Sequence, residues 1–290
     1  MSLAYERLLE HRREGDSREY DQSMLQLYGV GIGLGMDPLD EQQLAFLLED
    51  RLQVMPSFAT VAGFDMSFVL ELGIEWSKFL HVSERLQLFA PLPQSAGLRV
   101  NREIVAAFNK PAHNASLMVV RTTLIDAQDD RQLAQVDTVG LARDYPLPDA
   151  PLGRPDRLPP LPEREPDCEV AVPTSPQVAL IYRQLGGRGL IHCDPQDARN
   201  QGFDGPIMHG LSTYGHVCHA LVRDACDYDP ARLRSFAADF SAPVYPGEAI
   251  QVQIWHENDA LHFRARVDAR DTVVLDNGFA ELFDRPTGHA

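Results

Sequence analysis

The side chain best suited to proton transfer in this sequence is His192, in the segment YRQLGGRGLIHCDP at residues 182–195. A neutral imidazole can accept or deliver a proton near pH 7, so His192 is a candidate general acid or base. Without a neighbouring carboxylate it can hold a water molecule, but it has no partner with which to share two proton transfers. The alternative is a structural histidine, hydrogen-bonded just ahead of a helix, and the sequence leaves both interpretations open.

Other polar residues close to this histidine could supply the second group. Asp194 is followed by a proline, so it is better explained as the N-cap of a short helix that ends near Gly202. Asp197 would lie in the first turn of that helix, where the helix dipole favours a negative charge in any case. Asp204 belongs to the loop GFDGP, and Arg188 could instead bind a carboxylate or a phosphate. None of these residues is a convincing replacement.

Two other patterns are weaker signals of chemistry. The segment HVCH (residues 216–219) places two histidines on one helical face, but no paired CxxC or HxxxH spacing accompanies it. The glycine run GVGIGLG (residues 29–35) looks like a phosphate-binding loop, but it lacks the GKS or GKT that such loops need. We therefore predict neither a metal site nor a bound cofactor.

The elements that must position these residues are two helices, each followed by short strands. Residues 65–80 and 206–226 carry apolar side chains at intervals of three and four, which predicts a helix in each segment. After each helix come runs rich in Val, Ile, Leu and Phe, separated by turn residues, which predicts antiparallel strands. An Ala-Pro pair recurs at Ala90 and Ala242, half a chain apart, so the sequence favours one duplicated unit.

A proline-rich segment separates the two units. Residues 144–167 hold eight of the 21 prolines, and each proline removes a backbone donor and favours extended geometry around it. We expect an N-terminal unit at residues 1–143, a linker at 144–167 and a C-terminal unit at 168–290. The fold class is α+β, a double hot-dog in which two antiparallel sheets each wrap around a central helix.

The composition restricts the partners of the chain. With 26 basic and 42 acidic residues, the 290-residue chain carries a formal charge of −16. This balance argues against binding to nucleic acids or anionic membranes, which requires basic surfaces. The charged N-terminus predicts no signal peptide, and no apolar run approaches the roughly 20 residues of a membrane helix. Four cysteines without a CxxC pair favour a reduced protein, so we expect a cytoplasmic location.

Two longer stretches carry a family resemblance, at residues 27–65 (LYGVGIGLGMDPLDEQQLAFLLEDRLQVMPSFATVAGFD) and 173–215 (PTSPQVALIYRQLGGRGLIHCDPQDARNQGFDGPIMHGLSTYG). With FSAPVYPGE and VVLDNGFAEL further on, the chain resembles the MaoC-like, type-2 enoyl-CoA hydratases, which are double hot-dog proteins. The resemblance implies addition of water to trans-2-enoyl-CoA thioesters to give (R)-3-hydroxyacyl-CoA, or the reverse dehydration. It also implies an acyl-chain tunnel in the N-terminal half and a hydratase motif in the C-terminal half.

The motif itself departs from the family pattern. The family's form is Y-R-L-S-G-D-x-N-P-L-H, and the chain reads YRQLGGRGLIH without a gap. The family's histidine is present as His192, whereas its catalytic aspartate is replaced by Gly187 and its asparagine by Gly189. A glycine cannot transfer a proton, and the loss of one acid–base group costs roughly 10²–10⁴-fold in rate.

The resemblance assigns further residues to the site. Gly210 in PIMHGL matches the glycine whose backbone N–H binds the thioester oxygen; the alternative is a glycine that only eases helix packing. His81 in LHVSERLQLF matches the histidine of the family's L-H-G-E-Q segment. Arg232 and Arg234 match positions near the CoA phosphates, and with Arg188 and His81 they form the expected substrate-binding set.

We therefore expect a hydro-lyase of the enoyl-CoA hydratase type that acts on acyl-CoA thioesters and uses no cofactor. The alternative is a catalytically impaired hot-dog protein that binds acyl-thioesters or a partner subunit, because Gly187 and Gly189 offer no proton-transfer group. A changed reaction, hydrolysis of the thioester, is a third possibility. Hot-dog proteins bury helix faces and sheet edges by dimerising, so we expect a homodimer.

Overall fold

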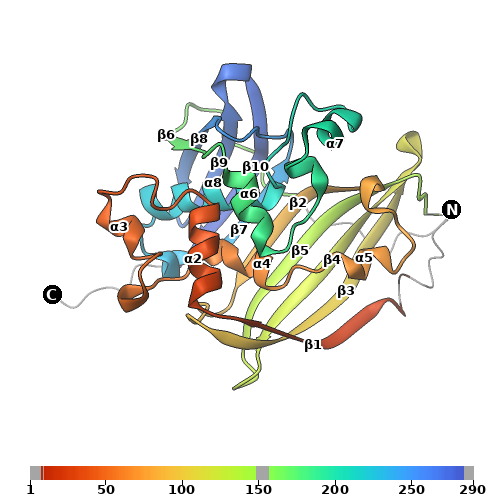
Figure 1. Cartoon of the computed structure of the whole chain (residues 1–290), viewed down its shortest axis with the longest axis horizontal. Coiled ribbons are helices and arrows are strands. Elements are labelled where there is room, and N and C mark those ends of the chain that lie inside the picture. Colours follow the sequence, from red (N-terminus) through yellow and green to blue (C-terminus); the bar gives the residue numbers. More distant parts are fainter. Residues whose placement is uncertain (1–7, 9, 148–156, 284–290) are drawn as a thin grey trace.

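A single antiparallel sheet of ten strands organises the part of the chain that the computed structural model describes, residues 8, 10–147 and 157–283 (Figure 1). Its strand order is β1-β3-β4-β5-β2-β7-β10-β9-β8-β6. The strands are β1 (Arg12–Tyr20), β2 (Phe79–Leu88), β3 (Ala96–Lys110), β4 (Ala115–Asp126), β5 (Gln132–Arg143), β6 (Cys168–Pro173), β7 (Leu233–Phe240), β8 (Ala249–Glu257), β9 (Ala260–Val267) and β10 (Thr272–Leu282).

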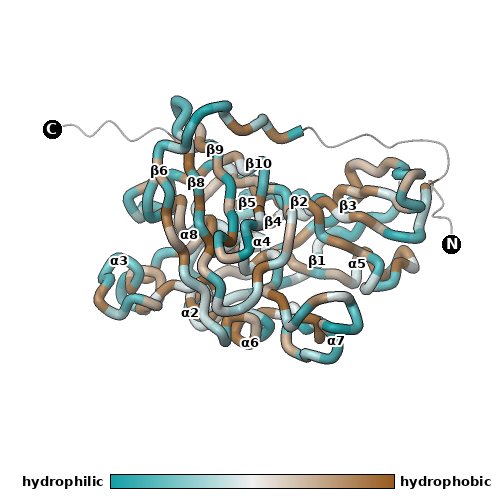
Figure 2. Tube along the Cα trace, turned by 90° about the horizontal axis from the view of Figure 1, so that it is seen from above, coloured by the Kyte–Doolittle hydropathy of each residue, from teal (hydrophilic) through white to brown (hydrophobic). Residues whose placement is uncertain are grey.

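Helices cover one face of this sheet. Viewed from above, α2, α6 and α7 lie in one layer and the strands in another, with α8 between the two (Figure 2). The α-helices of the described residues are α2 (Gln22–Gly31), α3 (Glu41–Leu44), α4 (Ala59–Ala62), α5 (Ser67–Leu70), α6 (Val178–Tyr182), α7 (Pro195–Asn200) and α8 (Gly210–Asp224). Only α2 and α8 are longer than two turns, so these two helices form the centre of the helical layer.

The sheet consists of two halves, β1 to β5 and β6 to β10, as the duplicated sequence pattern predicts. The two expected sheets are joined edge to edge, because β2 pairs with β7 from Ser83 opposite Asp239 to Gln87 opposite Ser235. The hydroxyl of Ser83 also donates a hydrogen bond of 3.1 Å to the carbonyl of Ala238 across this junction. The β2–β7 pairing therefore makes one continuous sheet out of two hot-dog halves.

The helix predicted at residues 65–80 is wrong in its extent. The structure has only α5 here, followed by a turn and a short 3-10 helix at Trp76–Lys78. Gly73 adopts a φ of +81°, in the left-handed region that ends a helix. Phe68 and Leu72 are nevertheless buried, so their spacing reports burial and not a continuous helix. Among the described residues, segment 65–80 therefore forms no long helix, and the long helix of the first half is α2.

The long helix α8 is buried on all sides. Every residue from Leu211 to Val222 is buried, which is the pattern of a helix inside a core and not on a surface. At Gly215 a Cβ would stand 2.5 Å from Ile32 and 2.8 Å from the hydroxyl of Tyr28, so a glycine is needed where α2 approaches. The hydroxyl of Ser212 also donates a 3.0 Å hydrogen bond to the carbonyl of Gly31 in α2. A helix from the first half thus packs on the central helix of the second.

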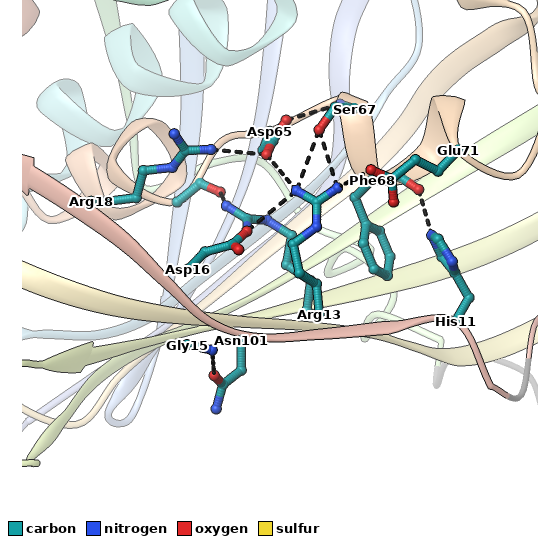
Figure 3. A network of polar contacts seen from close by, with 12 residues as sticks. His11, Arg13, Gly15, Asp16, Arg18, Asp65, Ser67, Phe68, Glu71 and Asn101 are labelled. Atoms are coloured by element: carbon teal, nitrogen blue, oxygen red, sulfur yellow. Dashed lines mark hydrogen bonds and ion pairs between the residues drawn. The ribbon is translucent and has the colours of Figure 1, made fainter.

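An ionic network fixes the segment before α5 against β1 and β3 (Figure 3). Arg102 of β3 is 2% exposed; its Nη1 lies 2.6 Å from the carboxylate of Asp16, and its Nη2 donates to the carbonyl of Gly63 at 2.7 Å. Arg13 of β1 donates to the carboxylate of Asp65 at 2.8 Å. Burial raises the pKa of Asp65, but hydrogen bonds from Ser67 and neighbouring arginines outweigh it and hold this pKa below its usual value. The network therefore holds residues 63–67 in place.

The proline-rich segment is only partly described. Residues 148–156 of the predicted linker at 144–167 lie outside the described residues, and the remaining described part contains no helix or strand. It rejoins the sheet at Asp167, whose backbone N–H donates to the carbonyl of Ile254 in β8. The division into units at 1–143 and 168–290 stays a prediction, since α2 and α8 pack across it.

Candidate active site

His192 lies at the end of a 3-10 turn, Leu190–His192, that precedes α7. Its Nδ1 is 2.9 Å from the carbonyl oxygen of Ile207. A carbonyl oxygen only accepts, so Nδ1 carries the hydrogen and Nε2 keeps its lone pair. Burial lowers the pKa of His192, although the hydrogen bond to Ile207 opposes this effect. The ring is therefore neutral at pH 7, with one nitrogen free to act as a base.

A second imidazole stacks on this ring. The ring centroids of His192 and His209 are 3.7 Å apart, and the ring planes differ by 22°. Nε2 of His209 lies 2.6 Å from the carbonyl oxygen of Gly187, so by the same reasoning Nε2 carries the hydrogen. Nδ1 of His209 is buried and has no hydrogen-bond partner among the described residues. Burial, together with the charge of a protonated His192, lowers the pKa of His209 to about 3.

The two glycines of the motif provide the room for these rings. A Cβ at Gly187 would stand 2.9 Å from Cδ2 and 3.1 Å from Nε2 of His209, closer than side chains approach one another. A Cβ at Gly189 would stand 3.3 Å from the ring of His192. A side chain at position 187 therefore requires the ring of His209 to move.

The N-terminus of α8 begins directly after the second histidine. Gly210 is the first residue of α8, and His209 is the N-cap residue with φ −62° and ψ 136°. The backbone N–H groups of Ser212 and Thr213 bond to the carbonyl of His209, whereas those of Gly210 and Leu211 precede the first intrahelical bonds. Such free N–H groups, aligned with the helix dipole, suit an oxygen that gains negative charge.

Close approach explains why position 210 is a glycine. A Cβ there would stand 3.2 Å from the ring of Phe240 in β7. The ring of Phe240 in turn lies 4.6 Å from that of His81 in β2, centroid to centroid. The ring of Phe240 therefore lies between His81 and the start of α8, and a role of His81 in substrate binding stays a prediction.

A cavity opens at the glycine-rich segment. It holds about 460 Å³ and is lined by residues 64–67 from the first half and 185–189 from the second. A smaller cavity of about 40 Å³ shares residues 64–66 and continues over β3, β4 and β5 to Arg102, Thr122 and Thr138. Gly187 and Gly189 line the larger cavity and contact His209 and His192, so both imidazoles lie directly behind its wall.

A buried carboxylate that the sequence analysis missed lies in β2. Glu84 is 1% exposed, and among the described acidic residues only Asp126 is also buried. Its Oε2 is 2.9 Å from Nε2 of His81. Burial, and then the charge of Glu84, raises the pKa of Tyr182, whose buried hydroxyl has no partner among the described residues. The available signal was a charged residue at an inward-facing strand position, next to the buried Leu86 and Leu88.

The acidic residues that follow His192 in the sequence are bonded elsewhere or exposed. Asp194 is the N-cap of α7 and accepts hydrogen bonds from the backbone of Gln196 and Asp197, as the sequence predicts. Its pKa is lowered by these two bonds. Asp197 accepts from the side chain of Gln201, and Asp204 is exposed.

The predicted arginines are not brought together. Arg188 is exposed and lines the larger cavity. Arg232 donates to the carbonyl of Ala225 at the far end of α8, and 15 helical residues span about 22 Å. Arg234 is exposed at the start of β7, about 20 Å of strand away from Phe240. The structure does not place Arg232 and Arg234 beside His192 and Gly210, so their contact with CoA phosphates stays a prediction.

Signals for metals and membranes gain no support from the described residues. No group of three or more His, Cys, Asp or Glu side chains there could hold a metal ion, and Nδ1 of His216 bonds instead to the carbonyl of Ser212. Among the helices described, none is both long and apolar enough to cross a membrane.

Comparison with known proteins gives a consistent result. Residues 19–143 match the model of the MFE-2 hydratase 2 N-terminal domain, and residues 157–277 match that of the MaoC like domain. The chain is 34% identical over 266 residues to an enoyl-CoA hydratase of Mycobacterium tuberculosis, covering 88% of this chain and 90% of that protein. It is 33% identical, with the same coverage, to a 3-hydroxyacyl-thioester dehydratase of that bacterium.

Solved structures agree with the sequence comparisons. A MaoC-like dehydratase from Phytophthora capsici superposes with a TM-score of 0.84 at 27% identity, covering 97% of this chain and 99% of that one. The peroxisomal multifunctional enzyme type 2 of Drosophila melanogaster gives 0.80 at 27% identity, covering 94% of this chain and 48% of that one. A Mycobacterium tuberculosis protein described as a double hot-dog covers 94% of this chain and 96% of its own, with a TM-score of 0.52 at 13% identity. The predicted α+β double hot-dog fold is confirmed.

Proposed function

We propose that this chain, which belongs to the family of MaoC-like dehydratases and type-2 enoyl-CoA hydratases, adds water to 2-enoyl-CoA thioesters. The product would be the (R)-3-hydroxyacyl-CoA, and the reverse dehydration uses the same site. The relatives that support the proposal are named for hydration of enoyl-CoA and dehydration of 3-hydroxyacyl thioesters. As members of this family act as hydro-lyases, the chain is an enzyme of that type.

One observation carries the proposal: a neutral imidazole base lies beside the free N–H groups of a helix. His192 stacks on His209, and His209 is the residue directly before the first N–H of α8. Hydration needs a base for the attacking water and donors for the thioester oxygen. Both kinds of group occur within one stretch of the structure, and the cavity beside it is lined by Gly187 and Gly189, which adjoin His209 and His192.

The steps follow from these groups. Nε2 of His192 removes a proton from water as the water oxygen bonds to C3, and the π electrons of the double bond move to the thioester oxygen. The N–H of Gly210 donates to that oxygen, and its negative charge is stabilised at the positive end of the helix dipole. The enolate then takes a proton at C2 from the imidazolium, which restores neutral His192. A lowered pKa favours this last transfer, because the buried imidazolium gives up its proton readily.

The alternative of an impaired binding protein rests on Gly187 and Gly189. Neither residue can transfer a proton, and Asp194, the acidic residue next along the chain from His192, caps α7. On that alternative the cavity and the start of α8 bind an acyl-thioester that is not converted.

The proposal is tested by measuring the turnover of 2-enoyl-CoA by the purified 290-residue chain. Crotonyl-CoA and longer or branched 2-enoyl-CoAs are offered, the loss of the conjugated thioester absorbance is followed, and the product's configuration is determined on a chiral column. We expect (R)-product and a rate at least about 10²-fold above His192→Ala. Binding by calorimetry without turnover would support the impaired protein, and release of free CoA thiol would indicate thioester hydrolysis.

A further inference from the structure

The two stacked histidines present one free acceptor nitrogen each. His192 donates through Nδ1 to Ile207 and keeps the Nε2 lone pair, whereas His209 donates through Nε2 to Gly187 and keeps the Nδ1 lone pair. Both tautomers follow from carbonyl partners, which cannot donate. The pair therefore offers two acceptors and no acid, in the place where the family motif offers an aspartate and an asparagine.

The acceptor on His209 has no partner of its own. His209 is 6% exposed, and its Nδ1 is buried without a hydrogen bond from any described residue. A buried polar atom without a partner is destabilising, and in native proteins it usually marks a bound water or ligand. The ring itself is tightly held, between the carbonyl of Gly187 and the ring of His192. Nδ1 of His209 is therefore a candidate acceptor for a bound water.

We propose that the attacking water is held between Nε2 of His192 and Nδ1 of His209, so that His209 orients the nucleophile in place of the missing side chains at 187 and 189. This inference rests on the proposed hydratase function. Each acceptor takes one hydrogen of the water, which leaves the lone pairs of its oxygen directed away from both rings and available for C3. His192 then removes its hydrogen as proposed above, while His209 keeps the other hydrogen bond throughout.

The electrostatics of the pair suit this division of work. A pKa of about 3 keeps His209 neutral under all ordinary conditions, so its Nδ1 stays an acceptor when His192 gains a proton. His209 thereby acts as a positioning residue and His192 as the base. Glu84 does not compete for the role, because its carboxylate is bonded to His81 in β2.

Three substitutions distinguish the role of Nδ1 of His209 from that of Nε2. In His209→Asn the side-chain oxygen can stand where Nδ1 was, but the bond to Gly187 is lost. In His209→Gln the amide nitrogen can stand where Nε2 was and keep that bond, but the acceptor is lost. His209→Ala removes both groups, and thermal unfolding of each variant shows whether it is folded.

We expect His209→Asn to keep kcat within about 10-fold of the unchanged enzyme, and His209→Gln and His209→Ala to lose about 10²-fold in kcat with little change in KM. A purely structural role, holding the carbonyl of Gly187, gives the opposite order, with His209→Gln the more active. That order, or equal loss in all three variants, would overturn the proposal.

A second measurement does not depend on turnover. A crystal structure of the full chain at high resolution should show a water within 2.6–3.2 Å of both nitrogens, and in His209→Gln that water should be gone. Nitrogen-15 NMR of the histidines should show the Nδ1–H tautomer for His192 and the Nε2–H tautomer for His209 at pH 7. If the water and tautomers are found but no enoyl-CoA is converted, the hydratase proposal fails and the water site stands; absence of the water overturns the site itself.

Discussion

In the proposed mechanism, backbone N–H groups and imidazole nitrogens act on the substrate and the water. Glycines leave the space that these groups occupy. At Gly210 the absence of a side chain lets the start of α8 approach the ring of Phe240. At Gly187 it leaves space that the ring of His209 fills. The space that a side chain at position 187 would need is therefore occupied by the ring of His209.

The oxyanion role of Gly210 can be tested without disturbing the helix. Proline is well tolerated at the first helical position, and the extended backbone of His209 is compatible with a following proline. Gly210→Pro removes the N–H and adds a ring whose Cβ stands 3.2 Å from Phe240, and it should lower kcat by about 10²–10³-fold with 2-enoyl-CoA.

Gly210→Ala is the matched control for this measurement. It keeps the N–H and adds a Cβ 3.2 Å from Phe240, so we expect a much smaller loss of kcat. If the alanine and proline variants lose activity equally, the N–H of Gly210 does not stabilise the thioester oxygen.

At the scale of residues, the sequence predicts part of the site. The spacing of the motif predicts His192 as the acid–base residue, and the structure stacks its ring on His209, the residue before Gly210; the catalytic role stays a prediction. The sequence did not point to His209 or Glu84, because their surroundings depend on three-dimensional neighbours: Gly187 against His209, and His81 beside Glu84 in the bulged strand β2.

At the scale of elements, α8 carries an internal pH sensitivity. His216 and His219 lie within its buried stretch, where burial lowers the pKa of His216 to about 4 and that of His219 to about 3. An unfolded histidine has a pKa of about 6.5, so below that pH the unfolded chain binds more protons than the folded one. As far as these two histidines are concerned, the free energy of unfolding is therefore highest above pH 6.5, and it decreases progressively as the pH falls toward 4.

Replacing one buried histidine should flatten this dependence. In His219→Leu the loss of unfolding free energy between pH 7 and pH 5 should be smaller by on the order of 2 kcal/mol, as measured by urea unfolding at each pH. His113 is exposed, so His113→Gln should follow the unchanged chain. An unaltered pH dependence in His219→Leu would contradict the argument.

The sequence predicted a helix at α8 correctly and a helix at residues 65–80 incorrectly, and both outcomes have the same physical reason. Apolar spacing identifies residues that face a core, and it located both α8 and the buried Phe68. It cannot show whether the backbone between such residues is one helix or several short turns. In residues 65–80 the left-handed backbone of Gly73 ends the helix. Asp65 is held by Arg13, which belongs to β1 and is distant in the sequence.

At the scale of the whole molecule, the junction between β2 and β7 makes the two halves dependent on one another. Leu86 is 2% exposed in the middle of β2 and stands opposite both Val136 of β5 and Phe236 of β7. Its side chain thus packs at the seam of the sheet. We expect the halves to unfold together, in a single cooperative transition.

Leu86→Ala should lower the free energy of unfolding by about 2–5 kcal/mol, because it leaves a cavity in the seam. Leu80→Ala on the same strand is the control, since Leu80 is 46% exposed and the loss should stay within about 0.5 kcal/mol. Each single-tryptophan variant reports on one half by its fluorescence: Trp76→Phe leaves Trp255 in the second half, and Trp255→Phe leaves Trp76 in the first. Two separate transitions in the unchanged chain would contradict the dependence of one half on the other.

The duplicated architecture was the most predictable property of the chain. Repeated strand runs and the Ala-Pro pairs indicated two copies of one unit, and the comparisons bear out the double hot-dog. The contact between α2 and α8 was not predictable, because it depends on a close fit at Gly215 between segments far apart in the sequence.

That contact has a consequence for how the chain is made. Gly31 and Ser212 are separated by 181 positions, so α2 leaves the ribosome long before its partner helix has been synthesised. At translation rates of about 5–20 residues per second, the delay is about 10–40 s. During this interval Leu25 and Tyr28, which end up buried, have nothing from α8 to cover them. Nascent chains of this protein should therefore engage chaperones until the second half emerges.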